Sequence, residues 1–168
     1  YLFPMPAAPA PAALPDDAAL TALRRRFGAH FIVITRAWRR EADLRLAPLG
    51  LSHATASALL LLRRQPESGI RQGALAAALS IEQPSLVPLL DQLGATGLVE
   101  RRPDPADRRA RSLHLTEAGL AAAASADSAL EALRTEVLQG CGAAQLATAM
   151  QVLERVAANL GREPGDLA

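Results

Sequence analysis

Residues 71–116, RQGALAAALSIEQPSLVPLLDQLGATGLVERRPDPADRRARSLHLT, decide the fold of this chain. Their first half predicts two short helices, 72–79 and 83–95, with a turn between them at Ser80 and Ile81. Two short helices joined by a tight turn are typical of a helix-turn-helix, which places its second helix in the major groove of DNA.

The second of these helices contains two prolines. Pro84 falls in its first turn, where the missing N–H costs little and the fixed φ suits helix entry. Pro88 fits less well, because four positions further on it removes an intrahelical hydrogen bond or leaves the start of the helix loose. Gly94 and Gly97 are expected to end the helix.

The second half of the stretch predicts a β-hairpin with a basic tip. Residues 98–102 and 111–115 form its strands around a turn-rich loop. The segment RRPDPADRRAR holds five arginines and two aspartates: Arg101, Arg102, Arg108, Arg109, Arg111, Asp104 and Asp107. Such a tip suits phosphate contact and entry into a narrow minor groove, although a solvated charged loop explains the same charges. Asp107 favours the first interpretation, because its carboxylate can accept N–H groups of Arg109 and orient that guanidinium.

Composition narrows the remaining possibilities. With 168 residues, 50% of them hydrophobic and 3% aromatic, the chain is long enough for one main core and should be mostly helical. Because the formal net charge is only +1, attraction to nucleic acid must come from local clusters of charge. The single cysteine excludes an internal disulfide and a multi-cysteine zinc site, and no apolar run is long enough for a membrane helix. We therefore expect a soluble, cytoplasmic protein with no cofactor, no metal and no membrane partner.

The N-terminal flank predicts an arm followed by a long helix. Residues 1–17 repeat proline and alanine without periodicity, and we expect a disordered arm there. Residues 18–47 predict one amphipathic helix with an apolar stripe: Leu20, Leu23, Phe27, Phe31, Ile34 and Trp38. This stripe is longer than one compact domain readily covers, so we expect it to pack on a second copy of the chain. A solvated surface helix over its own core is the alternative.

The remaining chain is predicted to complete the DNA-binding domain and the dimer layer. The winged helix-turn-helix domain spans residues 48–116 and includes a helix capped by Ser52. Residues 117–161 predict two further dimerisation helices, and 162–168 a short tail. A buried stripe is expected on the first of the two: Leu120, Ala124, Leu130, Leu133, Val137 and Leu138.

Four motifs together resemble the MarR family of bacterial regulators: IEQPSLVPLLDQL, GLVERR, DPADRRAR and LHLTEAG. The first is most similar to the SlyA branch, and the resemblance covers residues 27–119, with the flanking helices matching by pattern only. It implies a mainly α winged helix-turn-helix with a small β-hairpin wing and an N- and C-terminal helical dimer layer. It also implies a homodimer that binds pseudo-palindromic promoter DNA, usually as a repressor. Members often release DNA when a small, commonly aromatic and anionic molecule binds between the dimer layer and the DNA-binding lobes.

The resemblance assigns DNA-binding roles. Gln83 and Ser85 match positions facing the major groove, where Gln pairs with adenine and Ser bonds a base or phosphate, although Ser85 could merely satisfy the helix start. Arg108 and Arg109 match the wing tip. The full set is Gln83, Pro84, Ser85, Arg101, Asp107, Arg108, Arg109 and Arg111. Two departures are Pro88, where related sequences tend to carry arginine, and Arg71, where a small capping residue is expected.

The effector site is less well marked. An aromatic carboxylate needs a cation or donor beside an apolar wall, and His30, Arg36, Trp38 and His53 lie near the expected pocket. Each has another explanation: Trp38 as core, His30 as an interface residue, His53 as part of a helix cap and Arg36 as a solvated charge.

Other functional classes fit the sequence less well. No G-x-S-x-G elbow, H-E-x-x-H motif or glycine-rich phosphate loop supports an enzyme. A thiol redox switch would depend on Cys141, whose place between the last two helices favours inert packing. A winged helix used only for protein contact remains the main rival, and it predicts no salt-dependent DNA binding.

Overall fold

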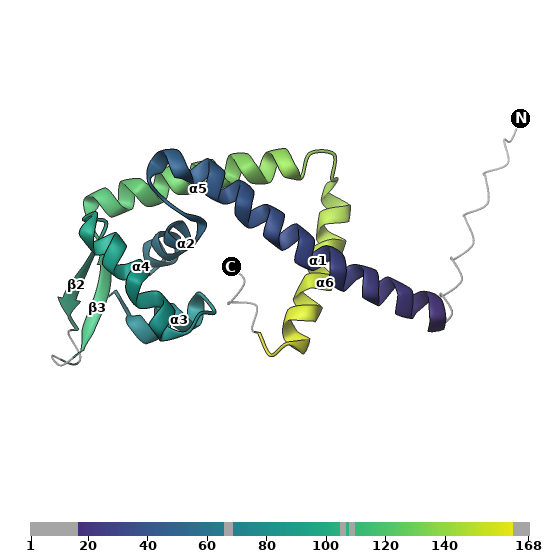
Figure 1. Cartoon of the computed structure of the whole chain (residues 1–168), viewed down its shortest axis with the longest axis horizontal. Helices are drawn as coiled ribbons and strands as arrows, with labels where there is room; N and C mark the ends of the chain where they lie inside the picture. The colour runs from purple at the N-terminus through teal and green to yellow at the C-terminus, as the bar shows by residue number, and fades with distance from the viewer. Residues whose placement is uncertain (1–16, 66–68, 105–106, 108–109, 163–168) are drawn as a thin grey trace, which may run out of the picture. The chain divides into compact units, whose positions relative to one another are not determined.

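The computed structural model describes residues 17–65, 69–104, 107 and 110–162. Within them lie six α-helices, one short 3-10 helix and three β-strands (Figure 1). By its internal contacts the chain divides into two units, Tyr1–Trp38 and Arg39–Ala168. The predicted architecture, mainly helical with a small β wing, is confirmed.

Helix α1 (Asp17–Leu46) matches the long helix predicted over residues 18–47 and crosses from the first unit into the second. In the first unit its large apolar side chains from Leu23 to Ile34 stay exposed, between 42% for Phe27 and 66% for Val33, while Leu20 and Trp38 are half-buried. The rings of Phe27 and Phe31 stack on each other with centroids 6.3 Å apart. In the second unit Ala42 and Leu46 are fully buried. The helix thus contributes to a core only through its last turns.

A 3-10 helix, η1 (Ala47–Leu49), leads into α2 (His53–Arg63), whose start follows from its cap. The Ser52 hydroxyl accepts a hydrogen bond from the Thr55 N–H at 3.2 Å, and Thr55 Oγ1 accepts one from the Ser52 N–H at 2.8 Å. This reciprocal capping box satisfies two amide groups that a helix start leaves unpaired. Helix α2 packs on α5 and β3, which makes it a central element of the second unit.

Helices α3 (Gln72–Ala78) and α4 (Gln83–Ala95) form the predicted helix-turn-helix. They meet at an angle of 107°, within the range typical of the motif. Ser80 makes the turn in the left-handed region, at φ +55°, and the Ile81 N–H donates to the Ala76 carbonyl at 3.0 Å. The core of the second unit lies beneath these helices, and its largest buried apolar side chains are Leu46, Leu59, Leu75, Leu86, Leu90, Leu93 and Leu133.

The wing belongs to a three-stranded antiparallel sheet with strand order β1-β3-β2. Strands β2 (Val99–Pro103) and β3 (Arg111–Leu115) confirm the predicted hairpin, with β2 displaced by one residue. The third strand, β1 (Ile70–Arg71), was not predicted, because two residues are too few to show an alternating pattern. It joins the start of α3 directly to the wing.

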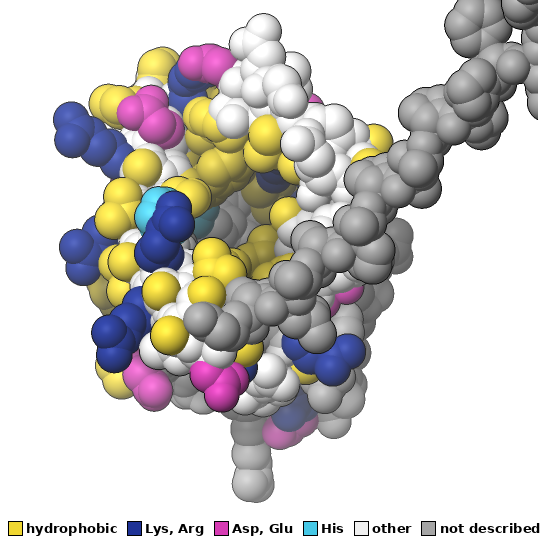
Figure 2. Space-filling model, turned by 90° about the vertical axis from the view of Figure 1, so that its right-hand side faces the viewer, with side chains coloured by type: hydrophobic (Ala, Val, Ile, Leu, Met, Phe, Trp, Pro, Cys, Tyr) yellow, Lys and Arg dark blue, Asp and Glu magenta, His cyan; other side chains and the backbone are white. Residues whose placement is uncertain are grey.

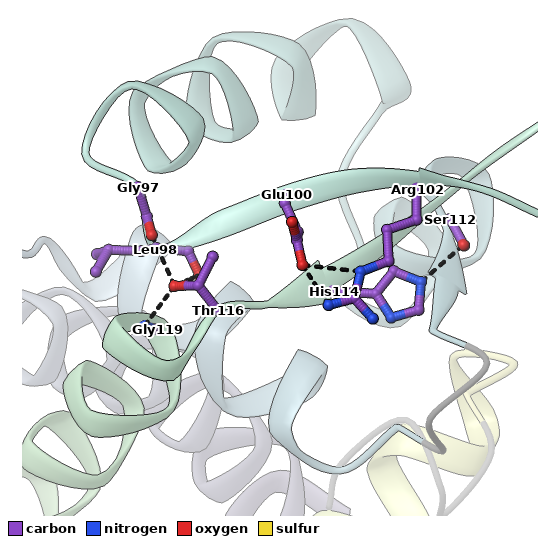
Figure 3. Close-up of polar contacts among 8 residues, drawn as sticks. All are labelled: Gly97, Leu98, Glu100, Arg102, Ser112, His114, Thr116 and Gly119. Atoms are coloured by element: carbon purple, nitrogen blue, oxygen red, sulfur yellow. Dashed lines mark hydrogen bonds and ion pairs between the residues drawn. The ribbon is translucent and has the colours of Figure 1, made fainter.

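Helix α5 (Glu117–Val137) begins where the wing ends. Thr116 Oγ1 accepts from the Gly119 N–H at 3.0 Å and donates to the Gly97 carbonyl at 2.7 Å (Figure 3). A Cβ on Gly119 would lie 2.0 Å from the Leu98 carbonyl oxygen, so only glycine allows this close approach.

The predicted buried stripe of α5 is wrong at four of its six positions. Leu120, Ala124, Val137 and Leu138 are exposed, whereas Leu130 and Leu133 are buried. The rest of the buried face consists of Gly119, Ala123 and Ala126. Because these residues are small, α5 can approach its neighbours closely on this face. Leu120, next to Gly119, then faces outward.

Helix α6 (Ala143–Asn159) buries only Ala157, and Met150 is 49% exposed. Cys141, just before this helix, is exposed, so its predicted packing is wrong. Figure 2 shows one face of the molecule on which hydrophobic side chains remain visible over a wide area. Among the described residues no single helix is long and apolar enough to cross a membrane; two bent pairs, Asp17–Leu49 with His53–Arg63 and Gln72–Ala78 with Gln83–Ala95, pass by length and composition only when combined.

Candidate nucleic-acid interface

The first turn of α4 brings together the predicted groove-reading residues. Gln83, Pro84 and Ser85 are all exposed, and the Ser85 N–H donates to the Glu82 carbonyl at 3.0 Å. The N-cap residue Glu82 makes no side-chain capping bond. A Cβ on Gly73 would lie 2.9 Å from Gln83 Nε2, so the Gln83 amide lies over the second residue of α3. These groups stand at a helix start, where side chains can reach base edges.

Helix α4 continues through Pro88 without a break, so the expectation of a loose helix start is wrong. The missing N–H would have bonded the carbonyl of Pro84, four residues earlier. Both prolines are exposed, and Leu86, Leu90 and Leu93 hold the opposite face of the helix in the core.

An ion pair connects the wing to α4. Arg101 Nη2 on β2 donates to Asp91 Oδ1 on α4 at 2.8 Å, with the two side chains 47% and 58% exposed. Arg101 was predicted to approach phosphate, and the structure gives its guanidinium a partner on the protein. Because a guanidinium carries five N–H groups, this bond leaves donors for a second partner. Arg111 is exposed and makes no ion pair within the described residues.

A second ion pair anchors the loop end of the wing to the start of α3. Arg71 Nε donates to Asp104 Oδ2 at 2.7 Å, and Asp104 is only 8% exposed. The hydrogen bond and charge of Asp104 raise the pKa of Arg71 above its ordinary value. Arg71 is indeed the N-cap of α3 and makes no side-chain capping bond. Where a small capping residue was expected, this arginine leaves α3 without a side-chain cap and pairs with the wing instead.

Asp104 also organises the turn of the wing. Its Oδ1 accepts from the Asp107 N–H at 3.2 Å, and its own N–H donates to the Ala110 carbonyl at 3.1 Å. The Ala110 N–H in turn donates to the Asp107 carbonyl at 2.9 Å. Arg108 and Arg109 lie outside the described residues, and with them the predicted Asp107–Arg109 contact.

One face of the sheet carries a polar row that includes the buried Ser112. His114 Nε2 lies 2.8 Å from Ser112 Oγ on the same strand, and Arg102 pairs with Glu100 on β2 (Figure 3). A Cβ on Gly69 would lie 2.5 Å from His114 Nε2, and Gly69 has φ +73°. Glycine is therefore needed there twice over, for its conformation and for the space that His114 takes. Within this row the guanidinium of Arg102 is paired with the carboxylate of Glu100.

A cavity of about 340 Å³ opens beside the helix-turn-helix. It lies in the second unit, and its lining comes from the end of α1, the start of α2, the α3–α4 turn and α4: Arg39, Asp43, Ser52, His53, Ala54, Ser57, Leu79, Ile81 and Leu89. The backbone N–H of His53 donates to Asp43 Oδ1 at 2.6 Å. Burial lowers the pKa of His53 below its usual value, the charge of Arg39 lowers it further, and Asp43 partly offsets both.

The other predicted effector residues, His30, Arg36 and Trp38, belong to the first unit. His30 Nδ1 lies 2.8 Å from the Arg26 carbonyl one turn earlier in α1, Arg36 is exposed and Trp38 is half-buried. His53 therefore lines a cavity, whereas His30, Arg36 and Trp38 lie on α1 in the first unit. The sequence-based set missed Arg39 and Asp43, which lie on the same helix after Trp38 and are four positions, about one turn, apart.

The comparisons with known proteins agree with this geometry. A family model described as MarR family matches residues 49–110. The crystal structure of transcriptional regulator PA3341 is 39% identical in sequence, superposes with a TM-score of 0.72, and aligns over 80% of this chain and 98% of that one. The chain belongs to the MarR family. This is a family of transcriptional regulators rather than of enzymes, while membership of the SlyA branch stays a prediction.

Two further MarR-like structures were solved with ligands. CouR from Rhodococcus jostii RHA1 bound to p-coumaroyl-CoA is 27% identical, with a TM-score of 0.71 over 78% of this chain and 91% of that one. The transcriptional repressor CouR bound to a 23-mer DNA duplex is 29% identical, with a TM-score of 0.73 over 80% of this chain and 94% of that one. The winged helix of this MarR-family chain is thus the fold of DNA-binding regulators.

Proposed function

We propose that this MarR-family chain is a homodimeric repressor that binds a pseudo-palindromic promoter site and releases it when a small aromatic anion binds. The observation that carries the proposal is the exposed start of α4 beside a wing that Arg101 ties to it. Helix and wing can then meet neighbouring grooves as one rigid element. CouR, with the same fold, has been solved on duplex DNA.

The dimer proposal rests on exposed apolar surface. Leu23, Phe27, Phe31 and Ile34 on α1 are 42–63% exposed, and a second copy of the chain is the simplest partner for such a stripe. We assign the dimer layer to residues 18–47 and 117–161. Two recognition helices would then stand roughly 34 Å apart, one turn of DNA, so that both enter successive major grooves.

Within each half-site we assign Gln83 and Ser85 to base edges and Arg111 to phosphate. Arg101 offers a phosphate the N–H groups that Asp91 leaves unused. Arg108 and Arg109 keep their sequence-based assignment to the wing tip, with Asp107 as the orienting carboxylate. Basic wings of this kind supply affinity that falls steeply with salt.

The effector proposal rests on the cavity around His53. Its volume of about 340 Å³ lies within the range for small-molecule sites. Leu79, Ile81 and Leu89 supply apolar wall, and Arg39 supplies a cation for a carboxylate. Because Leu89 belongs to α4 and Ile81 to the turn before it, a bound molecule would press on the recognition helix. His30, Arg36 and Trp38 remain proposed contributors from the first unit.

His53 gives this site a pH signature. Its lowered pKa leaves it neutral at pH 7, and a bound anion would favour the protonated form and raise that pKa. Anion binding should therefore take up protons. It should strengthen as pH falls through the raised pKa that His53 has in the complex, and level off below the lowered pKa that His53 has in the free protein. The lowered pKa has a second consequence: the stability contribution of His53 is complete above the unfolded value of about 6.5 and declines as pH falls below it.

Isothermal titration with salicylate in two buffers of different protonation enthalpy measures that proton uptake. His53→Gln should abolish the uptake while leaving binding measurable. His114→Gln, a histidine on the wing outside the cavity lining, is the matched control and should change nothing. Salicylate binding without proton uptake would remove His53 from the effector site.

The DNA-binding proposal is tested on the full chain with random-sequence duplexes. Wild type should enrich a pseudo-palindromic site and bind it with strongly salt-dependent affinity, and it should sediment as a dimer at micromolar concentration. A monomer would contradict the dimer assignment. Absence of any salt-dependent DNA binding would instead favour a winged helix that contacts only proteins. A reporter gene under the enriched site distinguishes repression from activation.

A further inference from the structure

The exposed face of α4 is unusual for a helix that reads DNA. Its sequence, QPSLVPLLDQLGA, contains no lysine or arginine and one aspartate. The residue before it, Glu82, is acidic and exposed. Arginine paired with guanine O6 and N7 is the commonest specific contact in the major groove. Helix α4 cannot make that contact, and Glu82 would repel the two acceptors that guanine presents there.

What α4 offers instead is a small apolar ridge. Pro84, Val87 and Pro88 stand at spacings of three and four, so they are neighbours on one helix face. All three are exposed, Val87 at 41%, and none of their side chains has a hydrogen-bonding group. The face on the other side, Leu86, Leu90 and Leu93, is already in the core, so the ridge has no partner within the described residues of its own domain.

The ridge is also rigid. Proline loses no side-chain entropy on burial, and valine is held near one χ1 rotamer in a helix. An apolar contact made by these three side chains therefore keeps most of its favourable free energy. In the major groove one base edge provides an apolar partner, the C5 methyl group of thymine.

We propose that α4 recognises thymine by its C5 methyl group through Pro84, Val87 and Pro88. The inference rests on the proposed DNA binding and specifies what the helix reads. Each half-site should hold thymine opposite the ridge, and the adenine paired with it suits the Gln83 amide. Pro88 is then part of the reading surface.

The test compares thymine with uracil, which lacks only the methyl group. The duplex that wild type enriches is synthesised once with thymine and once with deoxyuridine, and affinity is measured by fluorescence anisotropy at one salt concentration. Burying a methyl group is worth about fourfold in affinity. With one methyl in each half-site of a dimer, wild type should bind the thymine duplex roughly fifteenfold more tightly.

Variants locate the effect. Val87→Ala and Pro88→Ala should each bring the thymine-to-uracil ratio towards one, and circular dichroism checks that they fold. Leu49→Ala changes a similarly exposed apolar residue on η1, outside both α4 and the assigned dimer layer; it is the matched control and should keep the wild-type ratio. Any general loss of affinity cancels from the ratio.

Two results would overturn the inference while leaving DNA binding intact: equal affinity of wild type for both duplexes, or a ratio that Val87→Ala and Pro88→Ala leave unchanged. Failure of wild type to enrich any duplex would contradict the proposed function itself, and the inference with it.

Discussion

Helix α4 and the wing are neighbours joined by an ion pair, yet they differ in nearly every chemical respect. The exposed face of α4 combines an apolar ridge with uncharged polar residues and carries no charge apart from Asp91, whereas RRPDPADRRAR in the wing carries five arginines. Positive charge attracts every DNA sequence alike, because phosphate is the same everywhere. An apolar ridge attracts little until it meets a complementary base edge. We therefore expect the wing to supply most of the affinity for DNA and α4 most of the sequence specificity.

The largest effect should follow from removing the wing-tip charge. Arg108→Ala with Arg109→Ala should cost about 2 to 3 kcal/mol of binding free energy, roughly 30- to 160-fold in affinity, equally for all sequences. The slope of log affinity against log salt should become shallower by about two per protomer. Arg24→Ala with Arg25→Ala, an adjacent exposed pair on α1, is the matched control. An unchanged slope in the wing variant would show that α4 or another element supplies the attraction.

Asp104 should matter next, through the anchoring of the wing. Asp104→Ala leaves Arg71 and the Asp107 N–H without their acceptor, and we expect unfolding free energy to fall by about 1 to 3 kcal/mol in urea titrations. Glu100→Ala removes an exposed carboxylate from the same hairpin and should cost less than about 1 kcal/mol. Equal losses would mean that burial of Asp104 adds nothing to its pairing with Arg71.

Pro88→Arg gives α4 the charge that it lacks. Arginine faces solvent at this position, so we expect about tenfold tighter binding and a salt slope steeper by about one per protomer. Preference for thymine over uracil should weaken, because one side chain of the ridge is lost. Pro88→Gln is the uncharged control. If both variants show the same salt slope, charge on α4 does not reach the DNA and the comparison between helix and wing fails.

Local signals made the helix-turn-helix predictable. The bounds 83–95 were matched residue for residue by α4, because Pro84 marks the start and Gly97 follows the end, although Gly94 lies within the helix. The buried face of α5 differs from the predicted stripe, because the small residues Ala123 and Ala126 are buried while Leu120 is exposed. Size alone does not reveal which face approaches a neighbour.

Contacts between distant residues carried no such signal. Arg71 and Asp104 are 33 positions apart, and neither periodicity nor composition links them. The cavity around His53 likewise combines α1, α2 and the α3–α4 turn, so only His53 was found from the sequence. Charge clusters were visible in the sequence, but their pairing with Asp91 and Asp104 needed the fold.

The smallest effect concerns the Arg101–Asp91 bridge itself. Both side chains are about half exposed, so Arg101→Ala and Asp91→Ala should each change unfolding free energy by less than about 1 kcal/mol, with a coupling of about 0.2 to 1 kcal/mol in a double-mutant cycle. Their DNA affinities should differ, because Arg101→Ala loses a wing cation, whereas Asp91→Ala removes an acid from α4.

Exchanging the pair, Arg101→Asp with Asp91→Arg, keeps the net charge and the bridge but moves one cation from the wing to the helix. If the position of the charge, and not its total, separates affinity from specificity, the exchanged protein should fold normally and keep its salt slope. It should also enrich sites with guanine opposite α4. An unchanged preference for the DNA sequence would show that charge on this face does not select bases.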